Sequence, residues 1–506
     1  MSALVIRETF SRHKTNRGVN MANNSNDIRY VGVKENLAYG FANAGQVFGY
    51  NMVAGGYLSL FFTKVFGIPP EAVATMIIVL GIWDTINDPL MGALIDRTRT
   101  RYGKLRPYLL FVPLPLAITT VLLFSGPLIL QDVKSTAIKI VYMYLSYIIW
   151  ELFYTIGDVP FWGMSTAISP SPSDRTRAIS SARFISGIVG GLSLTLIPLL
   201  MDASEHNIIS LSLPQVFFLL SVIAATFGMG LFSLAGFFTK ERVVQSVKEP
   251  SVLEGFRLLA NNKPLLLIVC SSVIGSLGGL AGVFQSYYYA EVVNLSSLVL
   301  IINLPGTIFG WATYLLIPKL KKRFDNRQIV FLNTFVRVIT AVIVFVIGMN
   351  HCTDIRFIIP LLLVRNLIYS FFDTVNMVIP TEMIGDTVDY MEWKTGQRNE
   401  GVSFSVLTFV GKLTGSISTS VATALLPIIG LSYVDVGGVQ TAVKGEHTDV
   451  LIWAMFTLVP SVLGILSAIP YIWYDLTGEK LNGIRSDMAE RRAEKSKSVS
   501  GGENNA

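Results

Sequence analysis

Cysteine and histidine are scarce in this chain, whose 506 residues include two cysteines and four histidines. Cys270 falls in an apolar segment and Cys352 in a loop, so the sequence predicts no disulfide framework. The apolar segments contain no His/Cys metal cluster and no activated serine, which disfavours a membrane enzyme. A Walker-type glycine loop is also absent, so we expect neither a nucleotide cofactor nor an ATP-driven reaction.

Charged residues are few as well, at 15%, whereas 51% of the residues are hydrophobic and the mean hydropathy is +0.54. Apolar windows of about 20 residues, the length that crosses a bilayer, recur along the chain. We therefore predict an all-α membrane protein with twelve transmembrane helices. They are expected near 36–63, 72–95, 107–130, 137–166, 178–201, 213–238, 264–292, 296–318, 328–349, 356–382, 401–428 and 449–474.

Lysine and arginine are distributed unevenly over the expected loops. They concentrate after even-numbered spans, for example Arg97, Arg99 and Arg101 after the second and Lys321 and Lys322 after the eighth. Because cytoplasmic loops carry an excess of these residues, we predict a multi-pass protein of the cell membrane with both termini in the cytoplasm. The same loops explain the net charge of +6 and the pI of about 9.1 without a nucleic acid partner.

The longest charged connection inside the chain divides the expected spans six and six. The predicted parts are a cytoplasmic tail over 1–35, an N-terminal half over 36–238, a central loop over 239–263, a C-terminal half over 264–474 and a solvated, mostly disordered cytoplasmic tail over 475–506. Two parallel six-helix repeats bind their substrate near the midplane, between the halves, and expose it to the two sides in turn.

Two carboxylates and an amide lie on one face of the second span. Asp84, Asn87 and Asp88 are spaced i, i+3 and i+4, so their oxygens can converge on one small ion. A charged side chain in hydrocarbon is destabilising by several kcal/mol unless it is compensated, so such residues mark an ion or substrate pathway. The segment predicts a cation site, with Na⁺ held at Asp84 and Asp88.

The fourth span carries Tyr154, Asp158 and Trp162, which repeat every four residues along one face. A carboxylate between two aromatic rings suits a sugar, because the rings stack on its C–H surface while the carboxylate accepts hydroxyl hydrogens. The alternative is an aromatic packing stripe at the bilayer interface.

Two cations lie deep in later spans. Arg183 and Lys412 need partners at that depth, and Asp84, Asp88 and Asp158 are the natural ones. These pairs either couple ion binding to conformation or only hold helices together.

Several blocks of the sequence together carry a resemblance to a known family. They are 84–89 with Gly92 and Asp96, 103–107, 154–162, Arg183, 385–401, Thr408 and Lys412. This set resembles the signature of the glycoside–pentoside–hexuronide:cation symporters, the melibiose permease family of the major facilitator superfamily. The resemblance implies the twelve-helix major facilitator fold in two six-helix halves, and we expect a monomer in the lipid bilayer.

The resemblance also implies roles residue by residue. Asp84, Asn87, Asp88 and Thr155 match cation-binding positions, Asp158, Trp162 and Arg183 match sugar-contacting positions with Tyr154 beside them, and Thr408 and Lys412 match a pair in span eleven. One departure stands out in span one, where Gln46 and Val47 replace a lysine–aspartate pair of the family's melibiose-type site. Gln46 is thus expected at a changed substrate site, without the α-galactoside binding mode.

Opposite charges are expected at the cytoplasmic mouth. Arg97, Arg101 and Lys104 follow span two, and Asp386, Asp389 and Glu392 follow span ten. Their pairing would close an inner gate in the outward-facing state. The alternative is that they are solvated charges that set topology.

The sequence therefore predicts a secondary active symporter that imports a sugar, glycoside or hexuronide with a monovalent cation by alternating access. Asn87 offers a neutral oxygen, which favours sodium over a proton. Neutral glycosides rank first as the broader class, and hexuronides stay open because Arg183 and Lys412 remain where Val47 removes a negative charge. The alternatives are a lysolipid:cation symporter, which needs a greasier cavity, and a transport-dead sugar sensor.

Overall fold

The computed structural model describes residues 29–53, 56–243, 262–313, 316–395, 400–436, 439–484, 486–488 and 490. In these residues the helices form twelve consecutive segments. They are α2 (Val33–Val53) with α3 (Gly56–Leu60) and η1 (Phe61–Val65); α4 (Pro70–Arg97); α5 (Arg106–Phe111) with α6 (Pro113–Ile129); α7 (Thr136–Ala167); α8 (Pro172–Glu205); α9 (Leu213–Ile223) with η2 (Ala224–Gly228) and α10 (Met229–Phe238); α12 (Lys263–Ser276) with η3 (Leu277–Gly279), α13 (Leu280–Tyr287) and η4 (Tyr288–Val292); α14 (Leu298–Thr313), followed by the short α15 (Ile317–Lys321); α16 (Asn326–Gly348); α17 (Ile355–Thr395); α18 (Glu400–Ile428); and α19 (Thr448–Thr457) with α20 (Val459–Ala468) and η5 (Ile469–Trp473).

The twelve predicted spans are confirmed in the described residues. Eight helical segments there are long and apolar enough to cross a membrane. Several spans are divided into shorter pieces, as where α5 meets α6 at Val112. Prolines start many of these pieces, since a proline in the first helical turn forgoes no intrahelical hydrogen bond. Capping boxes start α9 at Ser212 and α16 at Asp325.

A β-hairpin was not predicted and corrects the all-α description. The chain turns away from α18 at Gly430, whose φ of 82° is the left-handed conformation common after the end of a helix. Strand β1 (Leu431–Val436) then pairs antiparallel with β2 (Val439–Lys444), with Leu431 opposite Lys444. We call this side of the molecule the hairpin end.

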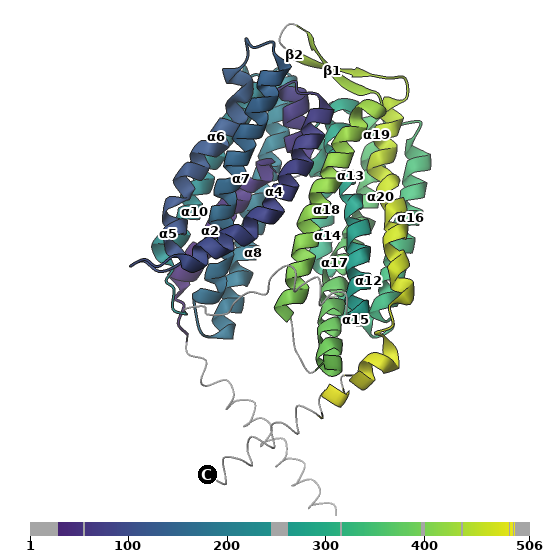
Figure 1. Ribbon diagram of the computed structural model, residues 1–506. Helices are drawn as coiled ribbons and strands as arrows, with labels where there is room; N and C mark the ends of the chain where they lie inside the picture. Colours follow the sequence, from purple (N-terminus) through teal and green to yellow (C-terminus); the bar gives the residue numbers. More distant parts are fainter. Residues whose placement is uncertain are drawn as a thin grey trace, which may run out of the picture.

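Two helical halves stand side by side, and their ribbons lie closest at the hairpin end and spread apart towards the opposite end (Figure 1). The main contact between them is the pair α4 and α18. Gly81 of α4 allows this approach, because a Cβ there would stand 2.2 Å from the Ser416 Cβ. Further along, the Ser420 hydroxyl donates to the Ala74 carbonyl at 2.7 Å.

Polar contacts join the halves at the hairpin end. The Lys64 ammonium lies 2.6 Å from Glu205 and 2.8 Å from Glu291, and thus bridges both halves. The Asp202 carboxylate accepts from the backbone N–H groups of Ser296 and Ser297 at 2.7 Å each. We call Lys64, Asp202, Glu205 and Glu291 the hairpin-end network, and it closes this end of the interface.

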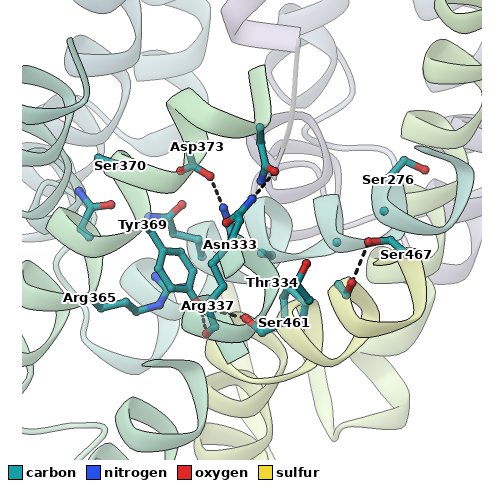
Figure 2. Close-up of a pocket in the computed structure, with 18 of the residues that line it drawn as sticks. Ser276, Asn333, Thr334, Arg337, Arg365, Tyr369, Ser370, Asp373, Ser461 and Ser467 are labelled. Atoms are coloured by element: carbon teal, nitrogen blue, oxygen red, sulfur yellow. Dashed lines mark hydrogen bonds and ion pairs between the residues drawn. The ribbon is translucent and has the colours of Figure 1, made fainter. Parts of the chain in front are cut away.

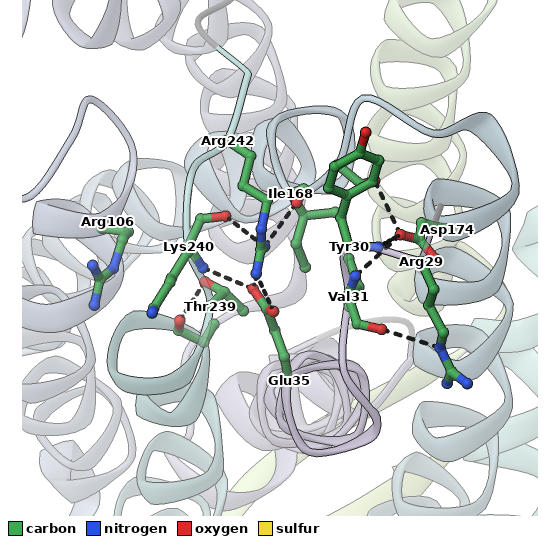
Figure 3. A network of polar contacts seen from close by, with 12 residues as sticks. Arg29, Tyr30, Val31, Glu35, Arg106, Ile168, Asp174, Thr239, Lys240 and Arg242 are labelled. Carbon is green, nitrogen blue, oxygen red and sulfur yellow. Dashed lines mark hydrogen bonds and ion pairs between the residues drawn. The ribbon is translucent and has the colours of Figure 1, made fainter. Parts of the chain in front are cut away.

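At the opposite end, polar contacts fasten the N-terminal half (Figure 3). Both Glu35 oxygens accept from the Arg242 guanidinium at 2.8 Å, and this hydrogen bonding raises the pKa of Arg242. Asp174 accepts from the backbone N–H groups of Tyr30 and Val31. Residues 29–35 of the predicted tail are therefore anchored, while residues 244–261 of the predicted central loop lie outside the described residues.

The C-terminal tail differs from the expectation of a solvated, disordered end. Residues 478–484 are helical, and Ile484 and Met488 are buried against the C-terminal half. The Trp393 indole donates to Asp487 at 3.0 Å. The expectation is wrong for this part because two apolar side chains amid polar neighbours find a partner surface; residues 491–506 lie outside the described residues.

Candidate functional site

The second span places its polar face against α18. Lys412 of α18 lies with its ammonium 3.4 Å from an Asp84 oxygen and 2.5 Å from an Asp88 oxygen. All three side chains are half-buried, with 20 to 35% of each exposed. The predicted pairing of Lys412 with these carboxylates is confirmed, and it joins the two halves of the molecule at the site.

Neutral polar groups lie beside the carboxylates. Asn87 is 2% exposed and Thr155 is 1% exposed. Within the described part of the chain, the Asn87 amide nitrogen and the Thr155 hydroxyl find no hydrogen-bond partner. The described residues hold no group of three His, Cys, Asp or Glu side chains placed to bind a metal. A cation here would therefore take two carboxylates plus amide and hydroxyl oxygens, which are donors that suit a hard monovalent ion.

Glu151 is a further carboxylate that our residue assignments did not include. It is 7% exposed and interacts electrostatically with Asp84, Asp88 and Lys412. Its spacing to Thr155 and Asp158, four and then three residues, puts it on their face of α7. That spacing is the signal in the sequence that points to Glu151.

A residue of the first span contacts the predicted sugar-binding face of α7. The Gln46 amide donates to the Asp158 carboxylate at 2.7 Å, and Gln46 is 3% exposed. Asp158 also interacts electrostatically with Lys412 and Asp88. Gln46 thus occupies the position next to the predicted sugar-binding carboxylate, and the sugar face and the cation face share one electrostatic environment.

Aromatic rings surround this carboxylate. Tyr154 stacks on Tyr50, with centroids 5.1 Å apart, and on Trp150, at 5.2 Å. The Arg183 guanidinium lies over the Trp162 ring at 4.4 Å. Tyr154 therefore has a packing role, as the alternative interpretation allowed, and Arg183 contacts an aromatic face. Tyr50 was missed because nothing in span one marks it as the partner of a ring in span four.

The predicted gate residues lie at the end away from the hairpin. Arg97 is the last residue of α4, and Arg101 is exposed beside Tyr102. Asp386, Asp389 and Glu392 lie on α17, which continues as one helix to Thr395 beyond the predicted end of span ten. Gating by these residues stays a prediction. Thr408 is on α18, but its side chain lies outside the described part.

The family-like block at 103–107 has a local structural explanation. The backbone N–H groups of Lys104, Leu105 and Arg106 all donate to the Glu241 carboxylate, at 2.8 to 2.9 Å. Gly103 has φ of 111°, and a Cβ there would stand 2.3 Å from a Glu241 oxygen. This loop therefore needs glycine for its backbone conformation and for the approach of Glu241.

Comparisons with known proteins agree with this architecture. Residues 38–478 match the family model for MFS/sugar transport proteins. Among curated relatives, the inner membrane symporter YicJ of Escherichia coli is 30% identical, over 91% of this chain and 95% of its own. A glucuronide carrier protein homolog of Escherichia coli is 28% identical, over 90% and 95%. The isoprimeverose transporter of Lactiplantibacillus pentosus is 28% identical, over 73% and 75%.

Solved structures show the same fold at low sequence identity. The nucleoside transporter NupG matches with a TM-score of 0.55 and 12% identity, over 87% of this chain and 98% of its own. A bacterial homologue of the lysosomal transporter Spinster, inward-facing and unoccupied, matches with a TM-score of 0.54 and 13% identity, over 87% and 97%. With the family model and the curated relatives, this places the chain in the glycoside–pentoside–hexuronide:cation symporter family of the major facilitator superfamily.

Proposed function

We propose that this protein imports a sugar or glycoside together with a monovalent cation. One observation carries the proposal: Lys412 lies against both Asp84 and Asp88, while Glu151 and Asp158 interact electrostatically with the same group. One ammonium cannot balance all of these carboxylates, and the remaining negative charge within the membrane spans favours binding of a further cation.

Lys412 supplies the coupling mechanism. Its ammonium lies against the same two carboxylates that an entering cation would use, so cation binding competes with this ion pair. Displacing Lys412 changes the field at Asp158, which interacts with both Lys412 and Asp88. Cation and sugar binding are then linked, and each raises the affinity for the other by the same factor.

The contacts between the halves support transport by alternating access. The hairpin-end network closes the side that the positive-inside rule assigns to the outside, so the conformation described is inward-facing under the predicted orientation. Opening that end would require Lys64 to release Glu291. Closing the other end would bring Arg97, Arg101 and Lys104 towards Asp386, Asp389 and Glu392.

Sodium is the favoured coupling ion, because the buried Asn87 and Thr155 can add neutral oxygens to the carboxylates. A proton is the second candidate for the coupling ion, since it needs only the carboxylates and no neutral oxygen. The names of two relatives, a glucuronide carrier homolog and an isoprimeverose transporter, support a sugar or sugar acid as substrate.

A binding screen tests the substrate. The purified protein is heated with neutral glycosides, pentosides, hexuronides and lysolipids, each with and without sodium, and the melting temperature is recorded. We expect a sugar to stabilise the parent, more strongly with sodium, and Asp158→Asn to lose this effect. Stabilisation by lysolipid alone, or by no sugar at all, would contradict the proposal. Binding without any vesicle counterflow would instead identify a sensor.

A further inference from the structure

The C-terminal half contains a polar cavity that the proposed transport site does not use. It has a volume of about 790 Å³ and is lined by α12, α14, α16, α17 and α20 among other elements of that half (Figure 2). Hydroxyl and amide side chains dominate its wall, including Ser271, Asn303, Asn333, Ser461 and Ser467. Volumes of this size are typical of small-molecule sites.

Arg365 of α17 is the most unusual residue of this wall. At 1.5 Å per residue it lies about 15 Å along the helix from Ile355, within the span expected over 356–382. It is 9% exposed, and its guanidinium lies over the rings of Tyr369 and Phe456 at 4.4 and 4.7 Å. One terminal nitrogen makes a long bond of 3.4 Å to the Phe456 carbonyl.

The guanidinium of Arg365 has no counter-charge in the described part of the chain. Its Nε has no hydrogen-bond partner, and no carboxylate pairs with it among the residues that the structure describes. The other charged residues of the wall, Arg337 and Asp373, pair with each other. The cavity therefore carries one net positive charge at a depth where an unpaired charge is strongly unfavourable.

Tyr369 fixes the position of both arginines. Arg337 lies over the same ring at 4.5 Å, and the Tyr369 hydroxyl bonds to the Arg337 carbonyl and to Ser461. Figure 2 shows Arg365, Tyr369 and Arg337 grouped at the cavity wall. The arrangement holds Arg365 in place before any ligand arrives.

We propose that this cavity binds an oxyanion, with Arg365 as its principal contact. A guanidinium offers two parallel N–H donors that match a carboxylate or phosphate, and the surrounding serines and asparagines can bind hydroxyl groups on the same ligand. The oxyanion can be the acid group of a sugar acid or free inorganic phosphate, which share this chemistry. Only the sugar-acid source rests on the proposed transport function.

The test is titration calorimetry of the purified full-length protein with glucuronate, glucose and inorganic phosphate, at fixed sodium and pH. We expect glucuronate or phosphate to bind the parent, and Arg365→Gln to weaken that binding by roughly tenfold or more. Binding of glucuronate alone identifies a sugar acid as the ligand, and equal binding of phosphate identifies the free anion. Arg356→Gln, which removes an exposed arginine from the same helix, is the matched control and should bind as the parent does.

A second variant keeps Arg365. Ser461→Asp places a carboxylate beside Tyr369, so it should neutralise the cavity and abolish anion binding even if Arg365→Gln does not fold. Anion binding of parental strength in either variant would overturn the proposal, as would a parent that binds no anion. If Asp158→Asn loses neutral-sugar binding while anion binding persists, the cavity is independent of the transport site. Equal loss of glucose and glucuronate in Arg365→Gln would mark a neutral sugar site instead.

Discussion

Lys412 is the residue on which the coupling mechanism depends. It reaches from α18 to both carboxylates of α4 and so links the cation face to the movement of the halves. Without a bound cation, Lys412 compensates part of this negative charge from within the protein. A cation that displaces Lys412 releases a charged contact between the halves, which lets ion binding change their relative stability.

Removing the Lys412 ammonium tests this role. In Lys412→Met we expect the apparent sodium affinity to rise by roughly tenfold, because an internal competitor of about 1.4 kcal/mol is lost; a half-exposed pair is weaker than a fully buried one. Net uptake should fall while sugar exchange persists, since the unloaded carrier is left with uncompensated carboxylates. Lys134→Met, at an exposed lysine, is the control. Unchanged sodium dependence and unchanged net uptake would contradict the mechanism.

Among the individual residues of the site, the charged ones could be predicted from the sequence, but not all of their neighbours could. Asp84, Asp88 and Lys412 could be found because a charge within an apolar helix needs a specific partner. Tyr50 could not, because a tyrosine in an apolar span is unremarkable until the fold brings it onto Tyr154. Glu151 gives the same signal as Asp158, a carboxylate within an apolar helix, but it was not among the predicted site residues.

Among the helices, α4 and α18 form the contact that brings the two halves to one site. Their close approach depends on Gly81, which faces Ser416 without a side chain of its own. Lys412 lies one helical turn before Ser416 on α18, so the same packing sets its distance from Asp84 and Asp88.

A methyl group at Gly81 should separate these helices. The new Cβ of Gly81→Ala would meet the Ser416 Cβ at 2.2 Å, so α4 and α18 must part near the hairpin end. We expect maleimide labelling of a cysteine placed at Ser59, which is buried there, to increase roughly threefold or more as the outward-facing population grows. Gly92→Ala on the same helix, where a Cβ meets nothing within 4 Å, should leave labelling unchanged. Equal labelling in both variants would show that this packing does not control the conformation.

Helix positions could be predicted more fully than the connections. Long apolar windows defined the spans, because the bilayer demands continuous hydrophobic length. The hairpin β1–β2 and the continuation of α17 to Thr395 were not predicted, because polar segments outside the membrane do not need a fixed hydrophobic length. The sequence marks Gly103 only as part of a family pattern, and its role in the loop is explained by its positive φ in the structure.

For the whole molecule, the hairpin-end network determines which side is closed. Lys64 contacts Glu205 of its own half and Glu291 of the other, and it is only 10% exposed. Tyr433 of the hairpin also donates to Glu291 at 3.0 Å. Glu291 is therefore one point at which the second half and the hairpin hold the first half, beside the contact of Asp202 with the Ser296 and Ser297 backbone.

Weakening this bridge should open the hairpin end. In Glu291→Gln we expect more labelling of the Ser59 cysteine than in the parent, because Lys64 loses its only charged contact to the other half in the described structure. Combining Glu291→Gln with Lys64→Met should add little beyond the single changes if the two residues act as one pair. Lys480→Met, which breaks an exposed pair with Asp475, is the control. A control response as large as that of Glu291→Gln would contradict a specific gate.

The measurement that tests the central claim most directly is uptake into proteoliposomes, with the sugar that stabilises the purified protein best. We predict accumulation above equilibrium when an inward sodium gradient is imposed at fixed pH, and loss of accumulation when the gradient collapses or when Asp88→Asn removes a cation-site carboxylate. An uptake driven by a pH gradient alone would assign the proton as the coupling ion. Accumulation that is indifferent to both gradients, or that survives Asp88→Asn, would contradict cation-coupled sugar transport by this site.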